Sequence, residues 1–258
     1  MPELIVERHG GVVTATINRP ARKNALTYEL FDALGALFGE VDARHEDRCL
    51  VLRGAGGDFC SGIDLSVLAE SRATTEAVPT MARINATALA LHDLRTPTIA
   101  AVDGLAVGAG MSLALGCDLV IASSAARFCA IFVRRGLSID FGLSWLLPRL
   151  VGAARARELC LLGEMLDATS ARAMGLVSDV VDPGALDERV AALAATLASG
   201  PSVAIAEDLA LLDASYARSF AEALDAEAAS QDVAGSSDDA REAIGAFLEK
   251  RPARFTGR

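Results

Sequence analysis

Short apolar runs alternate along most of the chain with stretches in which apolar residues recur every three or four positions. The runs predict buried strands, and the recurring positions predict helices with one buried face. Gly10 and Gly11 separate the first two runs, which favours a β-hairpin at this point. The predicted strands occupy residues 4–6, 12–17, 49–52, 98–102, 119–122 and 177–181.

The helical pattern begins after Thr27, which can cap a helix, and Thr169 is predicted to cap another. Further helices are predicted at residues 80–94, 109–116, 144–150, 153–162, 169–174, 185–198, 202–213, 217–232 and 238–250. Strands that are apolar throughout and alternate with helices predict an α/β fold, with a parallel or mixed sheet covered on both faces. The segment 66–80 is more polar and has no strong period, so we expect a mobile surface stretch there.

The pattern changes in the last quarter of the chain, where alanine-rich helices follow one another without strands. We therefore divide the chain into an α/β core, residues 1–190, and a helical C-terminal region, residues 191–258. Helices with so much exposed Ala and Leu are typical of surfaces that another subunit covers.

Composition excludes several classes of protein. The 258 residues fit one large domain with an appendage, and 52% hydrophobic against 22% charged residues excludes disorder. A net charge of −10 argues against nucleic acid as a partner. Five cysteines without CxxC spacing predict neither a disulfide framework nor a structural metal site. We see no secretory core or membrane-spanning run, so we expect a cytoplasmic protein without a membrane partner.

Two glycine-bearing loops, Gly57–Asp64 and Asp103–Gly110, each follow a predicted strand. Glycine at such a turn lets the backbone approach a ligand, and the free N–H groups of a helix start favour negative charge. The chain has no GxGxxG fingerprint with its acidic partner, no P-loop and no GxSxG elbow, which argues against three common nucleotide-binding and hydrolase folds. Taken singly, each loop could still be a simple tight turn.

Six pieces of sequence, two of which include these glycine loops, occur in a specific order; the one that begins at Val102 runs on to Cys117–Asp118. They are Asn18–Pro20 with Asn24–Leu26, Phe59–Leu65, Val102–Gly104 with Gly108–Gly110, Cys117–Asp118, Ala126–Phe128, Trp145–Arg149 and Ala171–Val177. With these pieces the chain resembles the crotonase (enoyl-CoA hydratase/isomerase) superfamily along nearly its whole length. The resemblance implies a crotonase (ClpP/crotonase-like) spiral fold of ββα units. It also implies a homotrimer or a hexamer (a dimer of trimers), with the C-terminal helices at the interface.

The resemblance also implies an acyl-CoA site that needs no separate cofactor, because coenzyme A is part of the substrate. The backbone N–H groups of Ile63 and Ala109 would form an oxyanion hole for the thioester carbonyl. Lys250, with Phe247, would reach the CoA of a neighbouring subunit. The other substrate-binding or CoA-binding residues implied are Arg22, Lys23, Ala25, Ser61, Gly62, Asp64, Gly108 and Phe132.

The expected reaction depends on which carboxylates are present. Hydratases of this family use two glutamates, and the matching positions here hold Ser112 and Phe132, so we do not expect efficient hydration. Asp140 stands where some isomerase branches carry a catalytic aspartate in a Pro-Asp-x-Gly loop, although Ile139 replaces the proline. A single base suits an isomerase, which takes a proton from one carbon and returns it two carbons along.

Several alternatives remain open from the sequence. Asp140 could simply cap the helix that begins near Gly142, although apolar neighbours favour a raised pKa for its carboxyl. Asp64 could likewise cap the helix that follows it. The protein could be a non-catalytic acyl-CoA binder, or a hydratase with weak activity. We expect Arg134 and Arg135 to form a solvated face or a subunit contact, and Trp145 to lie in the core.

Overall fold

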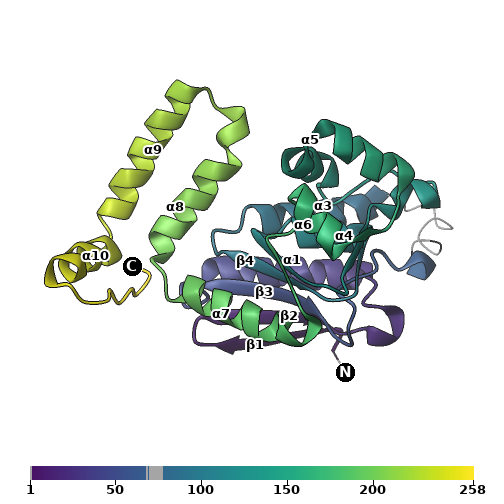
Figure 1. The fold of residues 1–258 in the computed structure, drawn as a ribbon, viewed down its shortest axis with the longest axis horizontal. Helices are drawn as coiled ribbons and strands as arrows, with labels where there is room; N and C mark the ends of the chain where they lie inside the picture. Colours follow the sequence, from purple (N-terminus) through teal and green to yellow (C-terminus); the bar gives the residue numbers. More distant parts are fainter. Residues whose placement is uncertain (1, 68, 70–77) are drawn as a thin grey trace.

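The computed structural model describes residues 2–67, 69 and 78–258 (Figure 1). Most of the 66–80 segment, for which a mobile stretch is predicted, lies outside the described residues. The main sheet has six strands in the order β1-β2-β3-β4-β6-β9. Their bounds are Leu4–His9, Val12–Ile17, Cys49–Gly54, Thr98–Val102, Leu119–Ser123 and Asp179–Val181. The first two strands form the predicted antiparallel hairpin, and all other neighbours pair in parallel.

Helices cover both faces of this sheet, as the apolar strands predict. On one face α7 (Leu186–Ala198) packs on alternate strand residues such as Val51 and Ile121. The intervening strand residues, such as Leu50 and Leu52, face a larger core with several helices. These helices are α1 (Tyr28–Ala43), α3 (Val78–His92), α4 (Ala109–Leu115) and α5 (Leu143–Leu162).

Two helix starts test the predicted caps. The Thr27 hydroxyl accepts a hydrogen bond from the Leu30 amide at 3.2 Å, so the cap of α1 is confirmed. The cap predicted at Thr169 is wrong. Asp167 precedes α6 (Ala168–Met174), and its carboxylate accepts the Ser170 amide at 2.7 Å. Thr169 therefore lies inside the first turn.

A second sheet of three short strands, in the order β5-β7-β8, was not predicted. The segment expected to be only a glycine-spaced turn contains β5 (Leu105–Val107), which pairs in parallel with β7 (Arg127–Cys129). β8 (Leu166–Asp167) completes the sheet. Because α4 begins two residues after β5, this sheet fixes where α4 starts. Downstream, η2 (Ile131–Arg135) is a 3-10 turn that follows β7 and leads towards α5.

The C-terminal helices form an arm. α8 (Ser202–Asp213), α9 (Phe220–Gly235) and α10 (Asp238–Glu249) extend away from the sheets in Figure 1. The predicted division at residue 190 falls inside α7, which packs on the main sheet along its length. Among the described helices, no single one is long and apolar enough to cross a membrane. One pair of helical segments, Pro183–Ala198 and Ser202–Ala217, would together be long and apolar enough, but they are bent by 104° relative to each other.

Candidate active site

The first glycine loop presents one amide towards a cavity. The Leu26 amide donates to the Gly62 carbonyl and the Asp64 amide donates to the Leu26 carbonyl, each at 2.8 Å. Successive amides of an extended segment point in opposite directions, so the Ile63 N–H points away from Leu26. Gly62 has φ +93°, a left-handed conformation that favours glycine.

The second glycine loop presents another amide beside it. Gly108, at φ +57°, donates its own amide to the Cys129 carbonyl at 2.9 Å, and α4 starts with the next residue. The first N–H groups of a helix have no partner within the helix, so the Ala109 amide is available. A Cβ at Gly62 would lie 2.7 Å from the Val107 carbonyl oxygen, and a Cβ at Gly110 would overlap the Cys60 carbonyl oxygen. The two loops therefore touch through bare backbone.

A cavity of about 290 Å³ opens where these loops meet. It brings together most of the residues predicted from the sequence. They are Arg22, Ala25, Ser61, Gly62, Ile63, Asp64, Gly108, Ala109, Phe132 and Asp140. Of the other two, Lys23 lies beside the cavity, because its carbonyl accepts the Ser61 amide at 3.0 Å. Lys250 ends α10 on the arm, and its contact with the CoA of a neighbouring subunit stays a prediction.

Asp140 carries an unpartnered carboxyl oxygen into this region. Its Oδ1 is buried and has no hydrogen-bond partner among the described residues. This burial raises the pKa of Asp140 to about 6. The proposal that Asp140 only caps the next helix is wrong, since Gly142 occupies the N-cap of α5 and no side chain bonds there.

Asp64 lines the same cavity but is fully engaged. Its carboxylate pairs with Arg19 at 3.0 Å and accepts both the amide and the hydroxyl of Ser66, at 3.1 and 2.7 Å. The Ser66 hydroxyl and the Arg19 guanidinium hold the pKa of Asp64 below its usual range. The expectation that Asp64 caps the following helix is confirmed, and its carboxylate is a poor candidate for moving a proton.

The two positions that hold glutamates in the hydratases carry no acid here. The Ser112 side chain is buried, with its hydroxyl 3.3 Å from both the Gly108 and the Asp140 carbonyl oxygens. Phe132 is also buried and lines the cavity. Ser112 therefore lies between the loop that carries Ala109 and the loop that carries Asp140.

The structure extends one expectation near the site and corrects another. Arg135 is exposed, as expected, and it also lines the cavity, because the turn η2 carries both Phe132 and Arg135. Its neighbour Arg134 instead donates to the Leu162 carbonyl at 3.0 Å. Trp145, expected in the core, is 37% exposed. Leu65 and Val107, which lie within the two quoted segments, line the cavity as well. Ile131 and Leu137 also line it, and no signal in the sequence pointed to them.

The described residues contain no cluster of three or more His, Cys, Asp or Glu side chains that could hold a metal ion. The site thus combines two free backbone amides, one unpartnered buried carboxyl and a cationic rim formed by Arg22 and Arg135. Such a pair of amides can hold an oxygen that gains negative charge, and the carboxyl can carry one proton. The fold, with the site at the start of α4, is that of a crotonase.

Comparison with known proteins agrees with this class. The family model for enoyl-CoA hydratase/isomerase matches residues 7–258, so the chain belongs to this family of acyl-CoA enzymes. The chain is 39% identical over 251 residues to the 1,2-epoxyphenylacetyl-CoA isomerase of Escherichia coli, covering 96% of each chain. It is 40% identical to a protein named probable enoyl-CoA hydratase from Rhodobacter capsulatus, covering 96% of this chain and 95% of the relative.

Solved structures give the same result. The crystal structure of an enoyl-CoA hydratase from Mycobacterium smegmatis superposes with a TM-score of 0.92 at 34% identity, covering 99% of both chains. An enoyl-CoA hydratase from Polaromonas has a TM-score of 0.93 at 30% identity, covering 98% of this chain and 99% of that one. The predicted fold class and family are thereby confirmed, while the relatives carry both hydratase and isomerase names.

Proposed function

We propose that the protein is an acyl-CoA isomerase that shifts a double bond through an enolate, with Asp140 as both base and acid. The observation that carries this proposal is the buried, unpartnered carboxyl oxygen of Asp140, whose pKa lies at about 6. A general base works best with a pKa near the operating pH. The name of the Escherichia coli relative, an isomerase, supports the same class.

The proposed reaction needs only one proton carrier. Ionised Asp140 takes a proton from C2 of a 3-enoyl-CoA, and the C–H electron pair moves towards the thioester oxygen. The amides of Ile63 and Ala109 stabilise this oxygen as it becomes negative, as preorganised donors do. Asp140 then returns the proton to C4 while the double bond forms between C2 and C3. No atom is gained or lost.

The hydratase alternative is less well supported by the site. Hydration requires one group to deprotonate water while a proton is delivered to the neighbouring carbon. Ser112 lies within hydrogen-bond distance of two backbone carbonyls, and Phe132 has no ionisable group. Arg22 at the rim is suited to the phosphates of CoA, which both enzymes and a non-catalytic binder would hold.

The experiment is the rise in ultraviolet absorbance when 3-enoyl-CoA becomes conjugated, measured with the parent protein and with Asp140→Asn. We expect turnover by the parent and a fall of about 10²–10⁴-fold in the variant. Affinity for a saturated acyl-CoA should stay within about threefold. Turnover unchanged in Asp140→Asn would contradict the proposal. Binding without turnover by either protein would favour the binder, and hydration of 2-enoyl-CoA by the parent would favour a hydratase.

We also propose that the chain forms a homotrimer or a dimer of trimers through its C-terminal arm. Large apolar side chains on the arm are exposed, including Phe220 at 81% and Phe247 at 82%. Exposed apolar patches of this kind mark association surfaces. A monomeric mass by light scattering at micromolar concentration would contradict this proposal.

A further inference from the structure

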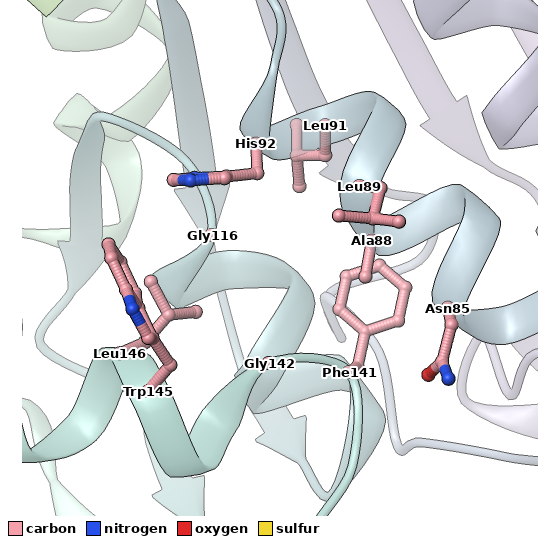
Figure 2. Close-up of a pocket in the computed structure, with 10 residues that line it drawn as sticks. All are labelled: Asn85, Ala88, Leu89, Leu91, His92, Gly116, Phe141, Gly142, Trp145 and Leu146. Carbon is pink, nitrogen blue, oxygen red and sulfur yellow. The ribbon is translucent and has the colours of Figure 1, made fainter. Parts of the chain in front are cut away.

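A second cavity, of about 450 Å³, lies between α3 and the start of α5. Figure 2 shows Phe141 on one side of it and Trp145 with His92 on the other. Leu91 and Leu146 also line it, so its surface is mainly hydrocarbon. The site described above does not use this space.

The two cavities lie at opposite ends of one short helix. Ala109, the first residue of α4, lines the active-site cavity, and Gly116, its C-cap, lines the second cavity. Seven residues at about 1.5 Å each separate these ends by roughly 10 Å. Carbon–carbon bonds of about 1.5 Å advance somewhat less than their length along a zigzag, so roughly eight carbons cover this distance.

One loop borders both cavities. Asp140 lines the active-site cavity and the next residue, Phe141, lines the second. Phe141 and Gly142 both have left-handed backbones, at φ +51° and +78°, which is uncommon for a bulky residue. The Phe141 side chain is buried, with its ring centroid 5.8 Å from that of Phe31. The loop thus turns two consecutive side chains into two different spaces.

The wall opposite Phe141 is held in place. Arg149 lies over the Trp145 ring at 3.7 Å, and His92 meets the same ring edge-on at 5.1 Å. A preformed wall is typical of ligand pockets, since ordering is then not required on binding. The active-site cavity alone, at about 290 Å³, lies at the lower limit of roughly 300–1,000 Å³ for such pockets.

We propose that the second cavity receives the distal, apolar part of the acyl chain, with the Phe141 ring as the movable partition between the two spaces. The inference rests on the proposed acyl-CoA site and names its substrate class, an acyl group of about eight carbons or more. A shorter acyl group ends before the partition and leaves the second cavity empty. Because Asp140 and α4 connect this cavity to the active-site cavity, the acyl chain is favoured as its occupant over a second copy of the chain. A second copy would make its contact through Leu89, which lines the cavity and is 58% exposed.

The test is calorimetric binding of saturated butyryl-CoA, octanoyl-CoA and dodecanoyl-CoA, which does not depend on turnover. Leu146→Trp fills the second cavity from α5, and Ala88→Leu fills it from α3. Leu161→Trp is the matched control, because it places the same side chain in α5 beyond the kink at Gly152, at a position that is 69% exposed. A buried methylene strengthens binding by about fourfold, so the parent should bind dodecanoyl-CoA at least tenfold more tightly than butyryl-CoA.

We expect Leu146→Trp and Ala88→Leu to weaken binding of dodecanoyl-CoA at least tenfold, of octanoyl-CoA less, and of butyryl-CoA less than twofold, with no change in the control. Equal loss for butyryl-CoA and dodecanoyl-CoA, or no loss for dodecanoyl-CoA in either folded variant, would overturn the proposal. A changed oligomer mass with unchanged affinity would assign the cavity to a second copy instead. If the parent protein fails to conjugate 3-enoyl-CoA but shows these chain-length effects on binding, the proposed isomerase activity is wrong and the role of this cavity is supported.

Discussion

The two regions that border the cavity, the pair of glycine loops and the loop that carries Asp140, are built in opposite ways. Around Gly62, Gly108 and Gly110 the chain packs backbone against backbone, and paired strands fix both loops. Around Asp140 the loop runs through left-handed residues and leaves a buried carboxyl oxygen without a partner. The first region therefore positions groups rigidly, and the second retains a group whose charge is poorly compensated. This difference suits the proposed roles of the two regions, an oxyanion hole in the first and a proton carrier in the second.

Of the substitutions that test this difference, Gly110→Ala should have the largest effect. Its Cβ would overlap the Cys60 carbonyl oxygen and lie 2.8 Å from the Cys60 Cβ, so the two loops would have to separate. We expect a loss of about 3 kcal/mol or more in the free energy of unfolding, measured by urea denaturation. Gly245→Ala in α10 is the control, because a Cβ there meets open space and should stabilise by about 0.5–1 kcal/mol. Equal stabilities for the two variants would contradict the tight contact.

The second prediction concerns the charge of the other loop. The pKa of Asp140 in the folded protein, about 6, lies above the ordinary value of 3.8 for an aspartate, so the folded protein binds this proton more tightly. The stability that this carboxyl contributes is therefore present below pH 4 and lost as pH rises from about 4 to 6. Asp140→Asn should be more stable than the parent by on the order of 2 kcal/mol at pH 7.5, with no difference below pH 4.

Asp64→Asn should change the stability at pH 7.5 in the opposite direction, so that this variant is less stable than the parent. The pKa of Asp64 is lowered by its bonds to Ser66 and Arg19, so its stabilisation is present above pH 4 and lost as pH falls through the folded pKa. Thermal melts of both variants across pH 3–8 check the pair. A stability change of the same sign in both variants at pH 7.5 would contradict the contrast.

The smallest expected effect is Ser112→Ala, which tests the link between the loops. The Ser112 hydroxyl lies at 3.3 Å from both carbonyls, so its loss should lower stability by about 1 kcal/mol. Because this hydroxyl lies against the Asp140 carbonyl, we expect kcat to fall a few-fold while KM is unchanged. A higher KM with the same kcat would show that Ser112 acts on substrate binding alone.

Much of the fold was readable from periodicity. The strands of the main sheet follow from short apolar runs, and the helix after Thr27 has a cap and a clear apolar face, so local pattern and tertiary structure agree. The second sheet was not predicted because strands as short as Leu166–Asp167 carry no period. Trp145 was misplaced because a tryptophan at a helix start reads as core, whereas its ring lies at a cavity rim.

The site shows the same division. The family resemblance, which the glycine motifs help to carry, implied the cavity residues from Ser61 to Asp64, and glycines required by close contact are visible in the sequence. The left-handed conformation of Phe141 was not predictable, since bulky residues seldom adopt it. Arg135 enters the cavity through the turn η2, whose direction depends on tertiary packing.

In the proposed reaction Asp140 alone carries the proton. The most direct test is the pH dependence of kcat/KM for conjugation of 3-enoyl-CoA, from pH 4.5 to 8. The base must be ionised in the free enzyme, so kcat/KM should fall tenfold per pH unit below about pH 6, the pKa of Asp140. The residual rate of Asp140→Asn should lack this inflection. An inflection near pH 6 that persists in Asp140→Asn would contradict the claim.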